Sequence, residues 1–77
     1  MKIEIWSKNN CPACDKAIYA ASKIESATTE VYKYEVDFSR ERLFEEFPTA
    51  KTFPQIKVDG VAIGGWDEFN KLYVEIK

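Results

Sequence analysis

The chain has 77 residues with 45% hydrophobic side chains, and its 11 basic and 13 acidic residues leave a formal charge of −2. This length allows one domain over residues 1–77, and the apolar content suffices for one compact core, which excludes wholesale disorder. The nearly balanced charge excludes a general attraction to nucleic acid or to an anionic membrane surface, so neither is expected as a partner.

The chain begins with alternating polar and apolar residues, and Lys2–Ser7 is predicted to be a strand. No apolar run of about 7–15 residues precedes it, as a signal peptide would need, and none in the chain approaches the roughly 18 residues of a transmembrane helix. We therefore expect a cytoplasmic protein. In that reducing compartment a disulfide is usually transient and catalytic.

A helical pattern begins at Cys11, after the polar loop Lys8–Asn10. Pro12 suits the first helical position because its missing N–H would have no partner there, so Asn10 or Cys11 is expected at the cap. The helix is expected to fade near residues 25–29. Apolar residues at helical spacing predict its buried face: Ala17, Ile18, Ala21 and Ile24.

Two further elements are predicted in the middle of the chain. Glu30–Asp37 alternates and is predicted to be the second strand. The side chains expected on one face of it are Tyr32, Tyr34 and Val36. Ser39 is expected to cap a second helix that ends before Pro48. The side chains expected on the buried face of that helix are Leu43, Phe44 and Phe47.

The last third of the chain predicts a hairpin and a terminal helix. Pro54–Val58 and Val61–Ile63 are predicted strands, joined by Asp59-Gly60, a strong signal for a two-residue hairpin turn. After Gly64-Gly65 apolar residues recur at helical spacing: Trp66, Phe69, Leu72, Tyr73 and Ile76. The order β-α-β-α-β-β-α, with the first two strands parallel, resembles the thioredoxin-like α/β plan, in which three helices flank a four-stranded mixed sheet.

The sequence Cys11-Pro12-Ala13-Cys14 lies between a predicted strand and helix, where such a spacing is typical of a redox motif. Only a thiolate attacks a disulfide, and the free N–H groups and positive dipole of a helix start favour the thiolate of Cys11. Cys14 lies three residues further on, so both sulfurs face one side of the helix. We therefore predict Cys11 as the nucleophile and Cys14 as the resolving thiol.

Two other interpretations of this pair stay open. A structural zinc site uses four ligands, whereas the chain has two cysteines and no histidine, so carboxylates or a second chain would have to complete it. The other alternative is a pair of buried, inert cysteines. Neither a resident metal nor a tightly bound cofactor is predicted.

Three segments together resemble the glutaredoxin family. Cys11-Pro12-Ala13-Cys14, Thr52-Phe53-Pro54 and Gly64-Gly65-Trp66-Asp67 match, in order, that family's Cys-Pro-x-Cys, Thr-x-Pro and Gly-Gly-acidic segments. The resemblance covers essentially the whole chain and implies a single, monomeric glutaredoxin domain. It implies an enzyme that reduces protein disulfides and glutathione mixed disulfides, with glutathione as co-substrate. Its expected partners are disulfide-bearing proteins, among which ribonucleotide reductase is a candidate.

The resemblance also implies where glutathione would bind. A cis Pro54 facing the cysteines would expose the backbone of Phe53, with which glutathione would pair like an added strand. Gly64 and Gly65 would allow close approach, so that the following N–H groups hold the γ-glutamyl carboxylate and Asp67 its ammonium.

The remaining expected contacts are weaker. Lys8 or Lys51 would attract the glycine carboxylate of glutathione, and Thr52 belongs to the same segment as Phe53. The structural alternatives are a trans proline opening an edge strand, a plain glycine turn followed by an acidic residue that complements the helix dipole, and solvated lysines.

Departures from the family pattern leave alternatives to glutathione. Ala13 stands where many glutaredoxins have Tyr, so an aromatic wall over the sulfurs is missing; Trp66 either restores it in part or packs in the core. Redoxins reduced by thioredoxin reductase share the fold and are the main alternative. An alternative from a different functional class is a metal-binding interaction module, whose cysteine pair would hold a metal together with a partner chain. A monothiol cluster-binding glutaredoxin is disfavoured, because those proteins typically lack a residue like Cys14.

Overall fold

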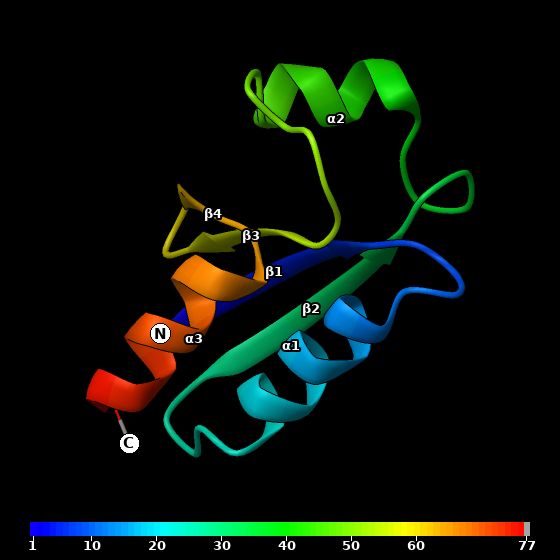
Figure 1. Cartoon of the computed structure of the whole chain (residues 1–77). Coiled ribbons are helices and arrows are strands. Elements are labelled where there is room, and N and C mark those ends of the chain that lie inside the picture. Colours follow the sequence, from blue (N-terminus) through cyan, green and yellow to red (C-terminus); the bar gives the residue numbers. More distant parts are fainter. Residues whose placement is uncertain (77) are drawn as a thin grey trace.

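A computed structural model of the chain describes residues 1–76 (Figure 1). The described residues form four strands and three helices in the predicted order. Their bounds are β1 (Lys2–Ser7), α1 (Pro12–Ser22), β2 (Thr28–Lys33), α2 (Arg40–Glu46), β3 (Gln55–Val58), β4 (Val61–Gly64) and α3 (Trp66–Ile76).

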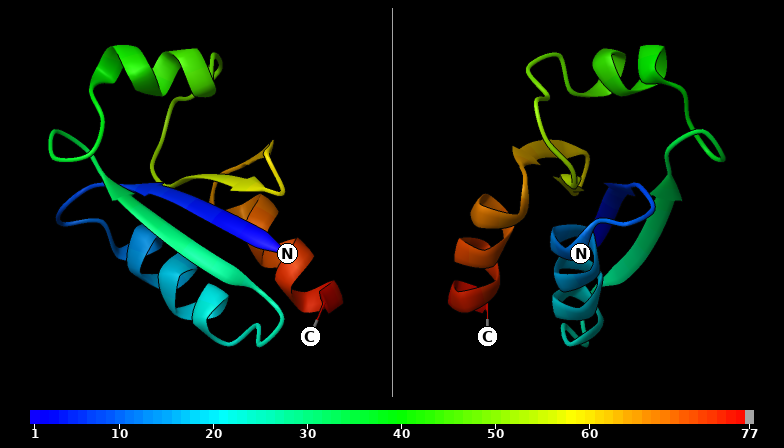
Figure 2. Two further views of the ribbon diagram at one scale, coloured as in Figure 1. Left: turned by 180° about the vertical axis from the view of Figure 1, so that it is seen from behind. Right: turned by 45° about the vertical axis from the view of Figure 1, so that its right-hand side comes forward.

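The strands form one mixed sheet in the order β2-β1-β3-β4. β1 and β2 are parallel, whereas β3 is antiparallel to both β1 and β4. Figure 1 shows α1 and α3 on one face of the sheet and α2 on the other, and both views in Figure 2 agree. The expected four-stranded mixed sheet flanked by three helices is therefore confirmed. None of the helices in residues 1–76 is long and apolar enough to cross a membrane.

The central strand β1 supplies side chains to a core on each face of the sheet, because alternate residues of a strand point to opposite faces. Ile3 and Ile5 are fully buried in a cluster with α1 and α3. Full burial of one such side chain contributes about 1.5–3 kcal/mol. Trp6 belongs to a second cluster with side chains of α2 and its flanks: Phe38, Leu43 and Phe47.

The first helix ends earlier than the sequence predicts. α1 stops at Ser22, and the N–H of Ile24 bonds the carbonyl of Ala21 in a turn that follows. Ile24 is nevertheless buried beside Ala17 and Ala21. The apolar spacing continues past the helix end because the turn keeps Ile24 on the same face.

The prediction of a strand over Glu30–Asp37 is wrong at both ends. Six residues of β2, from Thr28 to Lys33, pair with the six residues of β1, so the strand ends where its partner ends. Beyond it the chain turns through Glu35, whose φ is +67°, and the Asp37 carboxylate accepts the N–H of Lys33. Val36 consequently lies on the tip of a turn and is 76% exposed.

The second helix begins as predicted but buries a narrower face. The Ser39 hydroxyl accepts the N–H of Arg42, which confirms Ser39 as the cap. Leu43 and Phe47 are buried four residues apart, whereas Phe44 is 39% exposed. Helix α2 has only seven residues and contacts the core along one stripe, and Phe44 falls beside that stripe.

The hairpin and the last helix follow the prediction. Asp59 and Gly60 both have positive φ, at +49° and +83°, which a tight two-residue hairpin turn requires. Phe69 is fully buried and Tyr73 packs against the same cluster. The side chain of Ile76, also predicted on this face, lies outside the described residues.

Candidate active site

Cys11 and Cys14 are joined by a disulfide at the start of α1, with their Cα atoms 5.2 Å apart. Cys11 is the N-cap of the helix, and its Sγ accepts the N–H of Cys14 over 3.1 Å. Pro12 occupies the first helical position as expected. Cys11 is 7% exposed and Cys14 1%, so Cys11 is the more accessible of the two sulfurs.

The segment before β3 lies at the same end of the sheet as the cysteines. Trp6, near the end of β1, pairs with Gln55, the first residue of β3. The chain therefore passes through the Phe53–Pro54 peptide just before it reaches the end of β1 from which the cysteine loop leaves. That peptide is cis, so the predicted isomer is confirmed.

The backbone of Phe53 carries free hydrogen-bonding groups. Among residues 1–76 neither its N–H nor its C=O has a partner, while the neighbouring Thr52 carbonyl accepts the side-chain amide of Gln55. A buried backbone group is nearly always paired, but Phe53 is half-exposed and its groups are open to a partner from outside the chain.

The glycine segment closes on this peptide. A Cβ added to Gly65 would lie 3.2 Å from the carbonyl oxygen of Pro54 and 3.7 Å from the Oγ1 of Thr52. A side chain at this position would make a tight contact that the Pro54 carbonyl must relieve by a small shift. The fold therefore brings Gly65 next to Thr52 and Pro54, which lie more than ten residues before it in the sequence.

The start of α3 differs from the simple anion site that the sequence suggests. The N–H of Gly65 donates to Glu68 Oε1 over 2.8 Å, so a carboxylate of the chain itself holds this group. Glu68 also packs against Gly64, whose φ of +116° favours glycine. Sequence reasoning missed Glu68, although a carboxylate three residues after a helix cap is a known capping pattern.

The other predicted residues of this segment lie on different sides of the helix. Trp66 is half-buried, packs against the core cluster and contacts the Phe69 ring, with centroids 6.5 Å apart. Of the two predicted placements of Trp66, this contact is the core one. Asp67 is exposed in the first turn of α3.

Both predicted lysines lie around Phe53. The Lys8 Nζ is 5.6 Å from the centroid of the Phe53 ring. Lys51 lines a groove of about 260 Å³ that Phe53 also lines. The groove continues onto α2 through Arg40 and Phe44. Neither was predicted as a site residue, and Phe44 was expected in the core. Their only sequence signal is an arginine and an aromatic residue four apart on one helix.

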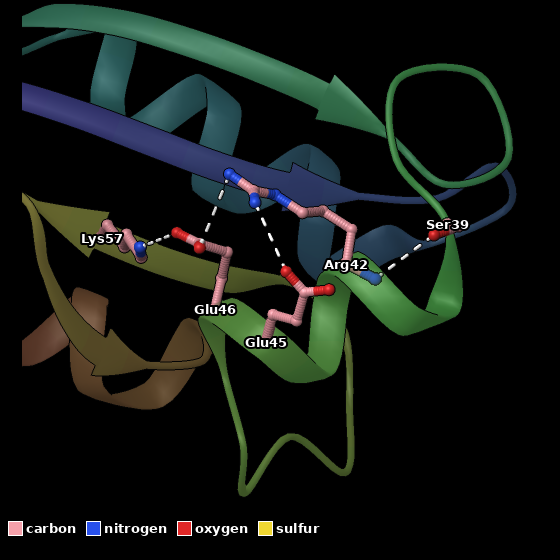
Figure 3. Close-up of polar contacts among 5 residues, drawn as sticks. All are labelled: Ser39, Arg42, Glu45, Glu46 and Lys57. Carbon is pink, nitrogen blue, oxygen red and sulfur yellow. Dashed lines mark hydrogen bonds and ion pairs between the residues drawn. The ribbon is translucent and has the colours of Figure 1, made fainter.

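An ion pair between Glu46 and Lys57 joins α2 to the sheet (Figure 3). Glu46 pairs with Lys57 of β3 and with Arg42 Nη2, the latter over 3.6 Å. The hydrogen bond from Lys57 lowers the pKa of the Glu46 carboxyl below its ordinary value.

A separate polar contact lies on β2, where the Tyr32 hydroxyl donates a hydrogen bond to Glu30. This bond raises the pKa of Tyr32 to about 12.

Within residues 1–76 no three side chains of the metal-binding types gather into a group that would hold a metal ion.

Several solved glutaredoxin structures match the fold of this chain. The reduced glutaredoxin of Escherichia coli matches with a TM-score of 0.84 and 26% identity, over 97% of this chain and 95% of that one. A glutaredoxin from Brucella melitensis matches with a TM-score of 0.74 and 26% identity, over 97% of this chain and 80% of that one. Glutaredoxin 1 from Francisella tularensis, complexed with cacodylate, has a TM-score of 0.70 and 23% identity over 97% and 94%, a likeness of fold alone.

No protein-family model and no curated protein sequence matches the chain. The structural matches confirm the resemblance and the thioredoxin-like fold that the three segments indicate.

Proposed function

We propose that this glutaredoxin-like chain, a thiol–disulfide oxidoreductase, draws its electrons from glutathione and passes them to protein disulfides and glutathione mixed disulfides. The observation that carries the proposal is the place of Cys11 at the cap of α1, joined to Cys14 and holding its N–H. The proposal takes residues 1–77 as one monomeric domain that acts in the cytoplasm, where a glutathione pool is available.

The reaction begins with the reduced pair. The Cys11 thiolate attacks one sulfur of a substrate disulfide and forms a mixed disulfide, and the other substrate sulfur leaves and takes up a proton. The Cys14 thiolate then attacks Cys11 Sγ, which forms the Cys11–Cys14 disulfide and releases the second substrate thiol. Two electrons have passed to the substrate. Two glutathione thiols restore the dithiol and become glutathione disulfide.

The helix start assists the steps in which the Cys11 sulfur is an anion. That sulfur carries negative charge before it attacks the substrate, and again when glutathione attacks the glutathione sulfur of a Cys11–glutathione disulfide; the N–H of Cys14 and the helix dipole stabilise this charge. A thiol that is favoured as an anion is also a good leaving group. Cys11 is therefore suited both to attack the substrate and to leave when glutathione attacks the glutathione sulfur of a Cys11–glutathione disulfide.

Glutathione is proposed because the unpaired and charged groups around Phe53 match the hydrogen-bonding and charged groups of this tripeptide. The unpaired backbone N–H and C=O of Phe53 offer two hydrogen bonds to the cysteine of an extended tripeptide. Lys8 and Lys51 lie near Phe53, where they would attract the glycine carboxylate. The N–H groups after Gly65, with Asp67 in the first turn of α3, would receive the γ-glutamyl end. Thr52, Pro54, Gly64 and Trp66 complete the proposed site.

Ribonucleotide reductase is proposed as one acceptor, on the resemblance alone. The alternative electron source is thioredoxin reductase, which would not need the glycine segment or Asp67.

A deglutathionylation assay tests the proposal. A peptide carrying a glutathione mixed disulfide is offered with glutathione, and release of the free peptide is measured. Cys11→Ser should abolish release, while Cys14→Ser should retain it because glutathione itself resolves the intermediate. Asp67→Ala should raise the KM for glutathione by up to about fivefold, the value of one exposed charge contact.

The matched control is Glu25→Ala, which removes an exposed carboxylate beyond the end of α1. It should leave the KM for glutathione unchanged. Loss of release in folded Cys14→Ser would argue against a glutathione site.

A further inference from the structure

We propose that the groove between α2 and Phe53 is the docking site for an acidic segment of the disulfide-bearing substrate protein, which inserts one apolar side chain. The inference rests on the proposed disulfide reductase function and names the class of protein substrate. It concerns the α2 side of Phe53 and the cations around it.

The groove is the right size for one side chain. Its volume is about 260 Å³, below the roughly 300–1,000 Å³ of sites that enclose a whole small ligand. The side chains that line it and carry the argument are Tyr34, Arg40, Leu43, Phe44, Lys51 and Phe53. Four of these six are apolar or aromatic, so the floor favours an apolar guest.

Glutathione does not account for this lining. Its glycine end carries a carboxylate and no apolar side chain, so Lys8 and Lys51 would satisfy it. Leu43 and the exposed part of Phe44 would have no matching group in that ligand. A peptide that continues beyond the reacting cysteine supplies the missing apolar contact.

The charge around the groove selects an acidic partner. Arg40 lies with its Cζ 5.5 Å from the Phe44 ring centroid, and Lys8 lies over Phe53 in the same manner. Among residues 1–76 neither these two cations nor Lys51 forms an ion pair. Two unpaired cations, Arg40 and Lys51, therefore line this groove, and a third, Lys8, lies over the Phe53 ring, in a chain whose formal charge is −2.

The neighbouring acidic residues limit where the partner's carboxylates bind. Glu35 and Asp37 line the next hollow, on the far side of Arg40. A partner carboxylate placed there would meet like charges. The favourable positions lie between Arg40 and the two lysines, on the side that leads to the cysteine loop.

The wall of the groove is held in place by contacts that the reaction does not use. Glu46 at the end of α2 pairs with Lys57 of β3 (Figure 3). Leu43 packs in the cluster of Trp6. Ser39 caps the start of the helix, one residue before Arg40. The groove is therefore formed before a substrate arrives, which lowers the ordering cost of binding.

Single-turnover reduction of synthetic peptides tests the proposal without glutathione. Each peptide has one cysteine in a disulfide with 2-mercaptoethanol. The three peptides differ only in the tripeptide next to the cysteine, which is Asp-Phe-Asp in the first, Asn-Phe-Asn in the second and Asp-Gly-Asp in the third. Fully reduced protein should react with the Asp-Phe-Asp peptide at least about fivefold faster than with the Asn-Phe-Asn peptide at low salt, and the difference should shrink in high salt.

Two variants locate the effect. Arg40→Gln should reduce the preference for aspartate about twofold to fivefold, the value of one exposed charge pair. Phe44→Ser should reduce the preference for phenylalanine over glycine. The matched control is Lys71→Gln, which removes an exposed cation of α3 on the other face of the sheet and should leave both preferences unchanged.

Equal rates for aspartate and asparagine peptides, or an equal loss of preference in Lys71→Gln and Arg40→Gln, would overturn the docking proposal while disulfide reduction stands. Failure to reduce any of the three peptides would overturn the proposed function itself.

Discussion

The backbone N–H of Cys14 donates a hydrogen bond to the Sγ of Cys11, with 3.1 Å between the two atoms. The donor belongs to the third residue of the helix and the acceptor to its cap, the arrangement in which a cap side chain satisfies a free N–H group. In the reduced protein this donor favours the anionic form of the Cys11 sulfur. We therefore expect the two cysteines to have different roles although both belong to one motif.

Alkylation should separate these roles. In Cys14→Ser the backbone donor is retained, so Cys11 should react with iodoacetamide at a pH clearly below that needed for a free cysteine, whose thiol ionises near about 8.5. In Cys11→Ser the remaining Cys14, which is almost fully buried, should react slowly across the same range. The measurement is the rate of mass increase against pH. Faster reaction of Cys14 would reverse the assignment.

Glu68 should oppose glutathione binding. Its carboxylate already holds the N–H of Gly65 and repels the γ-glutamyl carboxylate that the proposal places near it. Glu68→Gln keeps an oxygen to accept the Gly65 N–H but removes the charge. The KM for glutathione should fall about twofold to fivefold.

Glu68→Ala is the companion variant. It loses the hydrogen bond as well as the charge, so its melting temperature should fall while that of Glu68→Gln stays close to wild type. An unchanged KM in Glu68→Gln would mean that the γ-glutamyl group binds elsewhere.

The sequence was sufficient where the signal is local. Pro12 after Cys11 predicts the helix start, Asp59-Gly60 predicts the hairpin turn, and Ser39 predicts the cap of α2. Each of these residues determines its own backbone geometry. The thioredoxin-like fold followed because these local signals agree with one order of strands and helices.

The errors occur where a distant partner decides the outcome. The alternation over Glu30–Asp37 continues past Lys33, but β2 ends there because its partner β1 ends at Ser7. Phe44 has the spacing of a core residue, yet it is exposed because a short helix buries only one stripe. The groove beside Phe53 combines Tyr34, α2 and Lys51, and no sequence spacing relates these segments.

The pair of Glu46 and Lys57 should make stability depend on acid pH. The hydrogen bond from Lys57 lowers the pKa of Glu46 in the folded protein. The ionised carboxylate therefore stabilises the fold at pH values above the pKa of glutamate in the unfolded chain, about 4.3. That stability should be lost as the pH falls through the lower pKa that Glu46 has in the folded protein. The melting temperature of Lys57→Met should therefore fall less between neutral and acid pH than that of wild type.

The control for that comparison is Lys16→Met, which removes an exposed lysine of α1 on the other face. Its pH dependence should parallel wild type. Parallel curves for Lys57→Met as well would show that the ion pair adds no pH-dependent stability.

The pair of Tyr32 and Glu30 should act at alkaline pH. The hydrogen bond to Glu30 raises the pKa of Tyr32 from 10.0 to about 12. Because the pKa of Tyr32 is higher in the folded protein, the stability from its hydrogen bond is fully present below about pH 10 and is lost as the pH rises towards 12. Glu30→Gln should return the ionisation of Tyr32 towards 10.0.

Phenolate absorbance during an alkaline titration measures this shift, and Tyr32→Phe identifies which of the tyrosine signals belongs to Tyr32. A titration of Glu30→Gln that matches wild type would remove Glu30 as the cause.

The source of electrons is the central claim, and one coupled assay tests it. The oxidised protein is given a disulfide substrate and either glutathione with glutathione reductase or thioredoxin reductase alone, and NADPH consumption is followed. The account predicts steady turnover with glutathione, little turnover with thioredoxin reductase, and a higher KM for glutathione in Asp67→Ala. Rapid reduction by thioredoxin reductase with no turnover on glutathione would contradict it.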